Sequence, residues 1–135
     1  VLICHYMITF ERGFNMAYKD FTPGQLAAYF DHTQLKASAM ERDFEILCEE
    51  SKKYGFKMVA INPAPVMLCK KLLAGTAVHV GAAISFPLGQ TPIEAKCFET
   101  QTAIRQGADE IDYVVNLTML KEKNMIMWKR KWLRS

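Results

Sequence analysis

The stretch GADEIDYVVN, residues 107–116, decides the fold of this sequence. Its centre is rich in β-branched and aromatic residues and follows closely on a glycine, which predicts a short buried strand over residues 110–115. The strand carries one carboxylate, Asp112, between an isoleucine and a tyrosine. Because burying a charge costs several kcal/mol unless the charge is paired or hydrogen-bonded, we interpret Asp112 as a functional residue. The alternative interpretation is that Asp112 has a purely structural role.

Outward from this stretch, other segments have the same character. Residues 56–61 (FKMVAI) and 78–84 (VHVGAAI) predict two further buried strands. Residues 26–30, ahead of Asp31, are an ambiguous fourth candidate, because a capped segment that starts at Thr22 is expected to form a short helix that runs almost into them. The strands recur at the spacing of about one βα unit. Such an alternation predicts an α/β fold with a parallel sheet.

Helices are predicted between the strands from their ends. Three segments place a hydroxyl residue three positions before glutamine or glutamate, a pattern typical of a helix start; they are residues 22–25 (TPGQ), 38–41 (SAME) and 91–94 (TPIE). Three glycines stand where a helix end needs a left-handed backbone, namely Gly55, Gly75 and Gly107.

The composition narrows the class of protein. A chain of 135 residues that is 50% hydrophobic and 23% charged forms one globular domain. Its apolar runs are too short to cross a membrane. The four cysteines form no zinc-binding or disulfide pattern, so we expect neither a metal nor disulfides, and a reducing cytoplasm. The net charge of +3 comes from residues 125–135, which hold four basic residues and no acid.

Polar residues gather where the predicted strands end, and in parallel folds that edge holds the functional site. They are Asp31, His32, Thr33, Lys36, Asn62, Asn116 and the segment SFPLG of residues 85–89. Each has a plainer interpretation. Asp31 would cap a backbone turn, the histidines would pack structurally, and Lys36 and Lys96 would be solvated.

Several of these segments resemble one known family. DHTQLK (31–36), CEESKKYGFKMVAINP (48–63), ISFPLGQT (84–91) and KCFETQTAIRQGADEIDYVVN (96–116) are similar to deoxyribose-phosphate aldolases, and the similarity covers residues 21–124. The resemblance implies a (β/α)8 TIM barrel, of which this chain covers about the first four βα units. It implies reversible cleavage of 2-deoxy-D-ribose 5-phosphate to D-glyceraldehyde 3-phosphate and acetaldehyde through a lysine Schiff base. No cofactor, metal, nucleic acid or membrane is implied, and a homo-oligomer is compatible with the whole enzyme.

The resemblance also implies residue roles. Asp112 matches an aspartate that shuttles protons with a lysine, whereas Asp31 and Thr33 match a DxT pattern that lines the substrate pocket at the end of the first strand. Phe86 and Asn116 are expected to line the same pocket. Three positions depart from the family pattern: Ser85 stands in place of a usual glycine, Ala60 in place of a frequent cysteine and Thr118 in place of a common glycine.

The two ends of the sequence do not share the resemblance. We expect residues 1–15 to be a non-native extension with translation starting at Met16, residues 16–124 to be the amino-terminal half of an aldolase barrel, and residues 125–135 to be an anomalous tail. A shift of reading frame after Asn124 would explain the tail; a basic helix that binds nucleic acid or lipid is the alternative.

The Schiff-base lysine belongs to strands that the family has beyond this half, so we expect the chain alone to be inactive. A non-catalytic half-barrel or a flavodoxin-like binding module is the alternative function.

Overall fold

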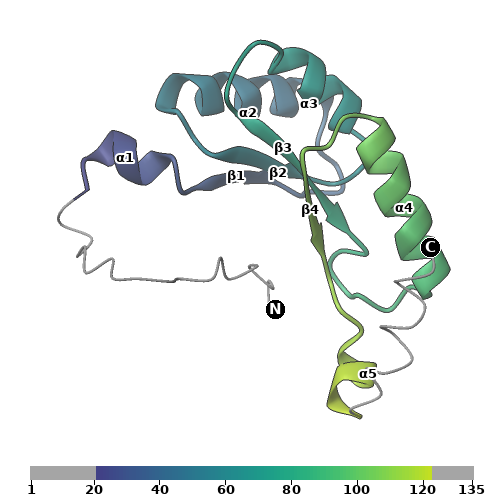
Figure 1. Cartoon of the computed structure of the whole chain (residues 1–135). Coiled ribbons are helices and arrows are strands. Elements are labelled where there is room, and N and C mark those ends of the chain that lie inside the picture. The colour runs from purple at the N-terminus through teal and green to yellow at the C-terminus, as the bar shows by residue number, and fades with distance from the viewer. Residues whose placement is uncertain (1–20, 123–135) are drawn as a thin grey trace.

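The computed structural model describes residues 21–122. Four parallel strands alternate with helices, and the strands lie in the sheet in chain order, β1-β2-β3-β4 (Figure 1). The strands are β1 (Asp31–Gln34), β2 (Met58–Ile61), β3 (His79–Ile84) and β4 (Glu110–Tyr113). The helices are α1 (Pro23–Ala27), α2 (Glu41–Tyr54), α3 (Val66–Leu72), α4 (Ile93–Arg105) and α5 (Leu117–Lys121). The predicted α/β fold with a parallel sheet is confirmed.

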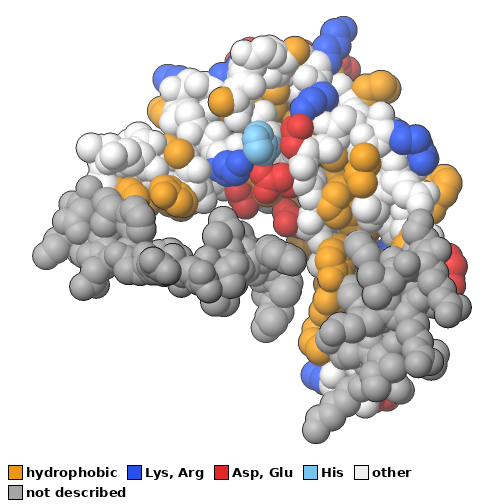
Figure 2. Space-filling view, viewed as in Figure 1, with side chains coloured by type: hydrophobic (Ala, Val, Ile, Leu, Met, Phe, Trp, Pro, Cys, Tyr) orange, Lys and Arg blue, Asp and Glu red, His pale blue; other side chains and the backbone are white. Residues whose placement is uncertain are grey.

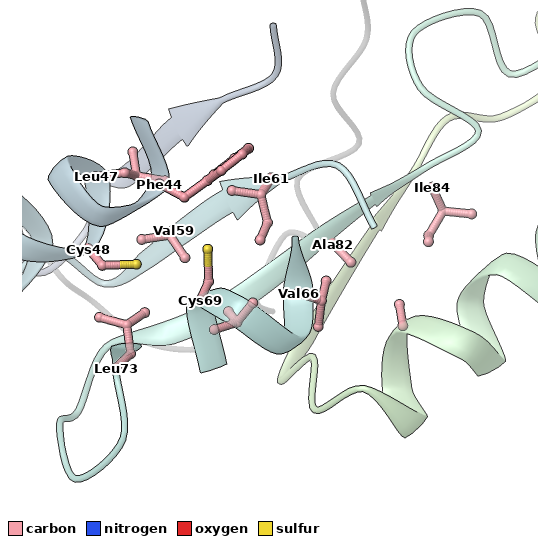
Figure 3. Packing of buried hydrophobic residues seen from close by; sticks show 12 residues of the cluster. Phe44, Leu47, Cys48, Val59, Ile61, Val66, Cys69, Leu73, Ala82 and Ile84 are labelled. Atoms are coloured by element: carbon pink, nitrogen blue, oxygen red, sulfur yellow. The ribbon is translucent and has the colours of Figure 1, made fainter. Parts of the chain in front are cut away.

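Helices α2, α3 and α4 cover one face of the sheet. One buried cluster joins side chains of these three helices to alternate residues of β2 and β3, as Figure 3 shows for most of its members. The cluster consists of Phe44, Leu47, Cys48, Val59, Ile61, Val66, Cys69, Leu73, Val80, Ala82, Ile84 and Ala103. A flavodoxin-like sheet has a different strand order and helices on both faces. The sequential order therefore excludes that alternative.

The two cysteines of this cluster lie in contact with each other. Cys48 of α2 and Cys69 of α3 are fully buried, and a hydrogen bond between the two thiols lowers the pKa of Cys48 and raises that of Cys69. Cys97 is also a free thiol, whereas Cys4 lies outside the described residues.

The structure agrees more closely with the predicted C-terminal ends of the helices than with their predicted N-terminal starts. Gly55, Gly75 and Gly107 all have positive φ, at 68°, 77° and 103°. The start at Thr22 is confirmed, because its hydroxyl accepts a hydrogen bond from the Gln25 N–H and the Gln25 side chain binds back to Thr22.

The other two starts are wrong in detail. Helix α2 begins two residues later than its SAME segment predicts, since Met40 and not Ser38 is the N-cap, and the Asp43 carboxylate accepts the Met40 N–H at 2.8 Å. In α4 the N-cap is Pro92, and the Thr91 hydroxyl bonds to the Ser85 hydroxyl instead of to the helix.

The first strand also differs from its prediction. Residues 26 and 27 belong to α1, and the strand starts only at Asp31. The physical reason is the capping box at Thr22, which stabilises a short helix over residues that are apolar enough for a strand. Asp31 and Thr33 are therefore inside β1 and not beyond its end.

Three sequence expectations concern residues that the structure does not describe. The extension of residues 1–15, the start at Met16 and the tail of residues 125–135 all lie outside the described range. Within residues 21–122, no helix is long and apolar enough to span a membrane.

Candidate active site at the strand ends

The face of the sheet opposite the helices carries the candidate catalytic residue. Side chains alternate between the two faces along a strand. Since Val80, Ala82 and Ile84 point into the helix-covered core, the register places the other set of residues on the opposite face, which we call the inner face. Its members are Asp31, Thr33, Met58, Ala60, His79, Gly81, Ala83, Glu110 and Asp112.

Asp112 lies on the inner face of β4, opposite Ala83 of β3. Its side chain is half-buried, as are all four residues of β4, so the expectation of a fully buried strand is wrong. The reason is position: among the described residues, β4 pairs with β3 on one side only. Asp112 is therefore a half-buried residue beside a small alanine on the inner face.

Asp31 and Thr33 share the inner face with Asp112 but lie on a distant strand. Strands β2 and β3 separate β1 from β4, so the two carboxylates are three strand spacings apart, roughly 14 Å along the sheet. The Thr33 hydroxyl donates to the Asp31 carbonyl oxygen at 3.0 Å. The structure thus places these predicted residues on one face without bringing them into contact with Asp112.

The loop after β3 has an unusual backbone. Ser85 has φ of 56°, in the left-handed region that favours glycine, and Phe86 is followed by a cis peptide bond to Pro87. The Ser85 N–H donates to the Glu99 carboxylate of α4 at 2.9 Å. This geometry explains why a glycine suits this position and how a serine is held there. Phe86 itself is half-buried at the strand end.

Asn116 follows β4 and begins α5. Its side-chain oxygen accepts the Met119 N–H at 3.1 Å, and its amide group donates to the Gln90 side-chain oxygen at 3.3 Å. Asn116 therefore caps α5 and also links that helix start to the loop after β3. Its predicted role in a substrate pocket remains a prediction.

Sequence reasoning missed Lys96. It was expected to be solvated, but its side chain on α4 is only 2% exposed. Its ammonium group donates to the carbonyl oxygens of Gly89, at 2.8 Å, and Val114, at 2.7 Å. Burial lowers its pKa, a change that the nearby Glu99 carboxylate opposes. The local sequence does not mark these two acceptors, which lie 7 and 18 positions from Lys96.

A cluster of charged side chains lies on the inner face at the amino-terminal end of the strands. His79 Nδ1 lies 2.6 Å from the Glu110 carboxylate, and Lys57 Nζ lies 3.3 Å from the same oxygen. Burial raises the pKa of Glu110, but hydrogen bonds from His79 and Lys57 prevail and lower it. In the space-filling view, acidic and basic side chains gather around a histidine on the visible face (Figure 2). In the part of the chain that the structure describes, no group of side chains is arranged to hold a metal ion.

These features define the class of protein. A parallel sheet in sequential order, helices on one face and a polar inner face are the architecture of a (β/α)8 barrel, of which residues 21–122 form four βα units.

The comparisons with known proteins identify the family. The chain is 53% identical over 104 residues to the deoxyribose-phosphate aldolase of Lactobacillus acidophilus, a match that covers 77% of this chain and 44% of the relative. It is 48% identical over 112 residues to that of Bacteroides thetaiotaomicron, covering 83% and 47%. A solved deoxyribose phosphate aldolase from Aeropyrum pernix, described as tetrameric, superposes with a TM-score of 0.69 at 36% identity, covering 73% of this chain and 42% of that one. No protein-family model matches. The chain belongs to the deoxyribose-phosphate aldolase family and spans slightly less than half the length of these relatives.

Proposed function

We propose that this chain is the amino-terminal half of a deoxyribose-phosphate aldolase, which cleaves 2-deoxy-D-ribose 5-phosphate reversibly into D-glyceraldehyde 3-phosphate and acetaldehyde. The observation that carries the proposal is the place of Asp112. It is a carboxylate on the inner face of β4, in a chain about half identical to enzymes of that name over the matched residues. The proposed setting is deoxyribonucleotide catabolism in the cytoplasm.

The chemistry assigns Asp112 a proton-transfer role. In a class I aldolase a lysine amine condenses with the sugar aldehyde, and the protonated Schiff base accepts the electrons of the breaking C–C bond. The resulting enamine must gain a proton before hydrolysis releases acetaldehyde. Asp112, together with a second lysine, would move that proton. Asp31, Thr33, Phe86 and Asn116 would line the pocket.

The proposal assigns the Schiff-base lysine to the half of the barrel that this chain does not match. Among the eight described lysines, Lys96 is buried against two carbonyl oxygens, and Lys57 and Lys70 are held in ion pairs. These arrangements suit structural roles better than attack on a carbonyl. We therefore propose that the chain by itself forms no Schiff base, and that the whole enzyme is a homo-oligomer, as its Aeropyrum pernix relative is described.

A chimaera tests the proposed function. The Lactobacillus acidophilus aldolase would carry residues 21–122 of this chain in place of its matched segment, which is close enough in sequence to fold with the remaining half. Cleavage of 2-deoxy-D-ribose 5-phosphate by the chimaera, followed through released acetaldehyde, is the expected result. A chimaera that folds as the parent does but has no activity, although the parent is active in parallel, would contradict the proposal.

A further inference from the structure

The ammonium group of Lys96 joins two backbone segments that are distant in sequence. Gly89 lies in the loop between β3 and α4, and Val114 is the residue that follows β4. Both carbonyl oxygens accept from the same Nζ, at 2.8 and 2.7 Å. Lys96 itself comes from the first turn of α4, so a single side chain ties together a helix, a loop and a strand end.

The two joined segments are packed closely. Gly89 has φ of 67°, and a Cβ there would lie 2.8 Å from Val114 Cγ1 and closer still to the Val115 carbonyl oxygen. The loop backbone can approach the strand end only because residue 89 has no side chain. The contact between the segments thus depends on both Gly89 and Lys96.

A second side chain of α4 acts on the same loop. Glu99, three residues after Lys96 and therefore near it on the helix, accepts the Ser85 N–H at 2.9 Å. The loop is held at residue 85 by Glu99 and at residue 89 by Lys96. Phe86 lies between these two attachments.

A buried ammonium group is costly, and its cost indicates a specific use. Packing alone would be served by a methionine of similar length, without desolvation of a charge. The charge is offset by two charge-assisted hydrogen bonds, each stronger than a bond between neutral groups. Such an arrangement fixes geometry more than it adds stability.

We propose that Lys96 is a positioning residue that locks residues 85–89 to residues 114–116. The lock sets the place of Phe86 relative to Asp112 and Asn116 at the candidate site. This consequence rests on the proposed function of the site, whereas the lock itself does not.

Hydrogen exchange of the 135-residue chain tests the lock. The Gly89 amide donates to Ser85 and the Val114 amide donates to Ile84. In Lys96→Met both amides should exchange about tenfold faster or more, because residues 85–89 and 114–116 separate in local openings. The amides of Lys57 and His79, which bond at the opposite end of the strands, should stay within about threefold of the wild-type rates. Lys71→Met makes the same chemical change at an exposed position of α3 and should change neither set.

A second variant approaches the lock from the loop. Gly89→Ala leaves Lys96 in place but forces the two segments apart, so Gly89 and Val114 should again exchange faster together. In wild-type protein the Lys96 ammonium protons should give a slowly exchanging NMR signal at neutral pH, and Gly89→Ala should speed their exchange. A merely structural lysine would not couple these readouts.

The outcomes separate clearly. Equal acceleration at both ends of the strands in Lys96→Met, no acceleration at either end, or a loop that responds to Gly89→Ala without Val114 would each overturn the lock. If Lys96→Met does not fold, Gly89→Ala and the ammonium signal decide. An inactive chimaera would contradict the proposed function but would not affect the exchange test of the lock.

Discussion

Lys70 of α3 holds both carboxylate oxygens of Asp109, at 2.6 and 2.8 Å, across 39 positions of sequence. Asp109 in turn exchanges two hydrogen bonds with Val80: its N–H donates to the Val80 carbonyl oxygen at 2.8 Å, and its carboxylate accepts the Val80 N–H at 2.9 Å. The Lys70 stem passes so close to Gly107 that a Cβ there would lie 2.9 Å from it. Asp109 therefore sets the register of β4 against β3 and, with it, the place of Asp112.

Asp109→Ala should lower the free energy of unfolding by about 1–3 kcal/mol, because the Val80 N–H and the Lys70 ammonium both lose their acceptor. Urea denaturation measures the change. Glu45→Ala is the matched control, since the one ion pair of Glu45 among residues 21–122 is with the exposed Arg42, and its loss should cost less than about 0.5 kcal/mol. Equal effects of the two substitutions would contradict the structural role of Asp109.

Acid should destabilise the protein through two adjacent carboxylates. Burial raises the pKa of Asp109, but bonds from Lys70 and Val80 prevail and lower it below 3.8; Glu110 is likewise lowered below 4.5. Below those ordinary values the unfolded chain binds protons that the folded chain does not. The stability that these groups contribute is therefore complete above about pH 4.5 and is lost as the pH falls through the lowered pKa values.

The measurement is the free energy of unfolding at several pH values between 7 and 3 for wild type and Glu110→Gln. The variant should show a shallower acid loss, since one of the two linked groups no longer titrates. A loss as steep as that of wild type would mean that Glu110 is not linked to folding.

Ser85 has a strained left-handed backbone and a hydroxyl that is hydrogen-bonded to Thr91. Glycine at this position removes the left-handed strain, worth about 1–2 kcal/mol, whereas alanine keeps it. Both lose the hydrogen bond to the Thr91 hydroxyl. We expect Ser85→Gly to be more stable than Ser85→Ala by about 1 kcal/mol or more, measured by thermal or urea unfolding. Alanine equal to glycine would show that φ at residue 85 carries no strain.

Local patterns in the sequence were enough to predict the strands over residues 78–84 and 110–115 to within two residues, because alternation, β-branching and terminal glycines are local signals. The position of Asp112 on β4 followed from them. The ambiguous first strand was misplaced because a capping box competed with an apolar run. Lys96 was missed because its two acceptors lie 7 and 18 positions away, and Asp109 because Lys70 lies 39 positions away. No local pattern marks such contacts.

Asp112→Asn in the aldolase chimaera should lower kcat by about 10²–10⁴-fold, the usual contribution of a positioned acid–base group. Glu110→Gln is a close control, since it removes a carboxylate from the same face of the same strand two residues earlier. Its kcat should stay near that of the parent chimaera. Comparable losses in both variants would place the effect in folding and not in proton transfer.

Borohydride trapping tests the central claim most directly. The 135-residue chain and the chimaera would each be incubated with 2-deoxy-D-ribose 5-phosphate, reduced with borohydride and mapped by peptide mass spectrometry. We predict no adduct on the chain alone and, on the chimaera, an adduct at a lysine outside the residues that this chain contributes. A stable adduct on any of the twelve lysines of this chain would contradict the account.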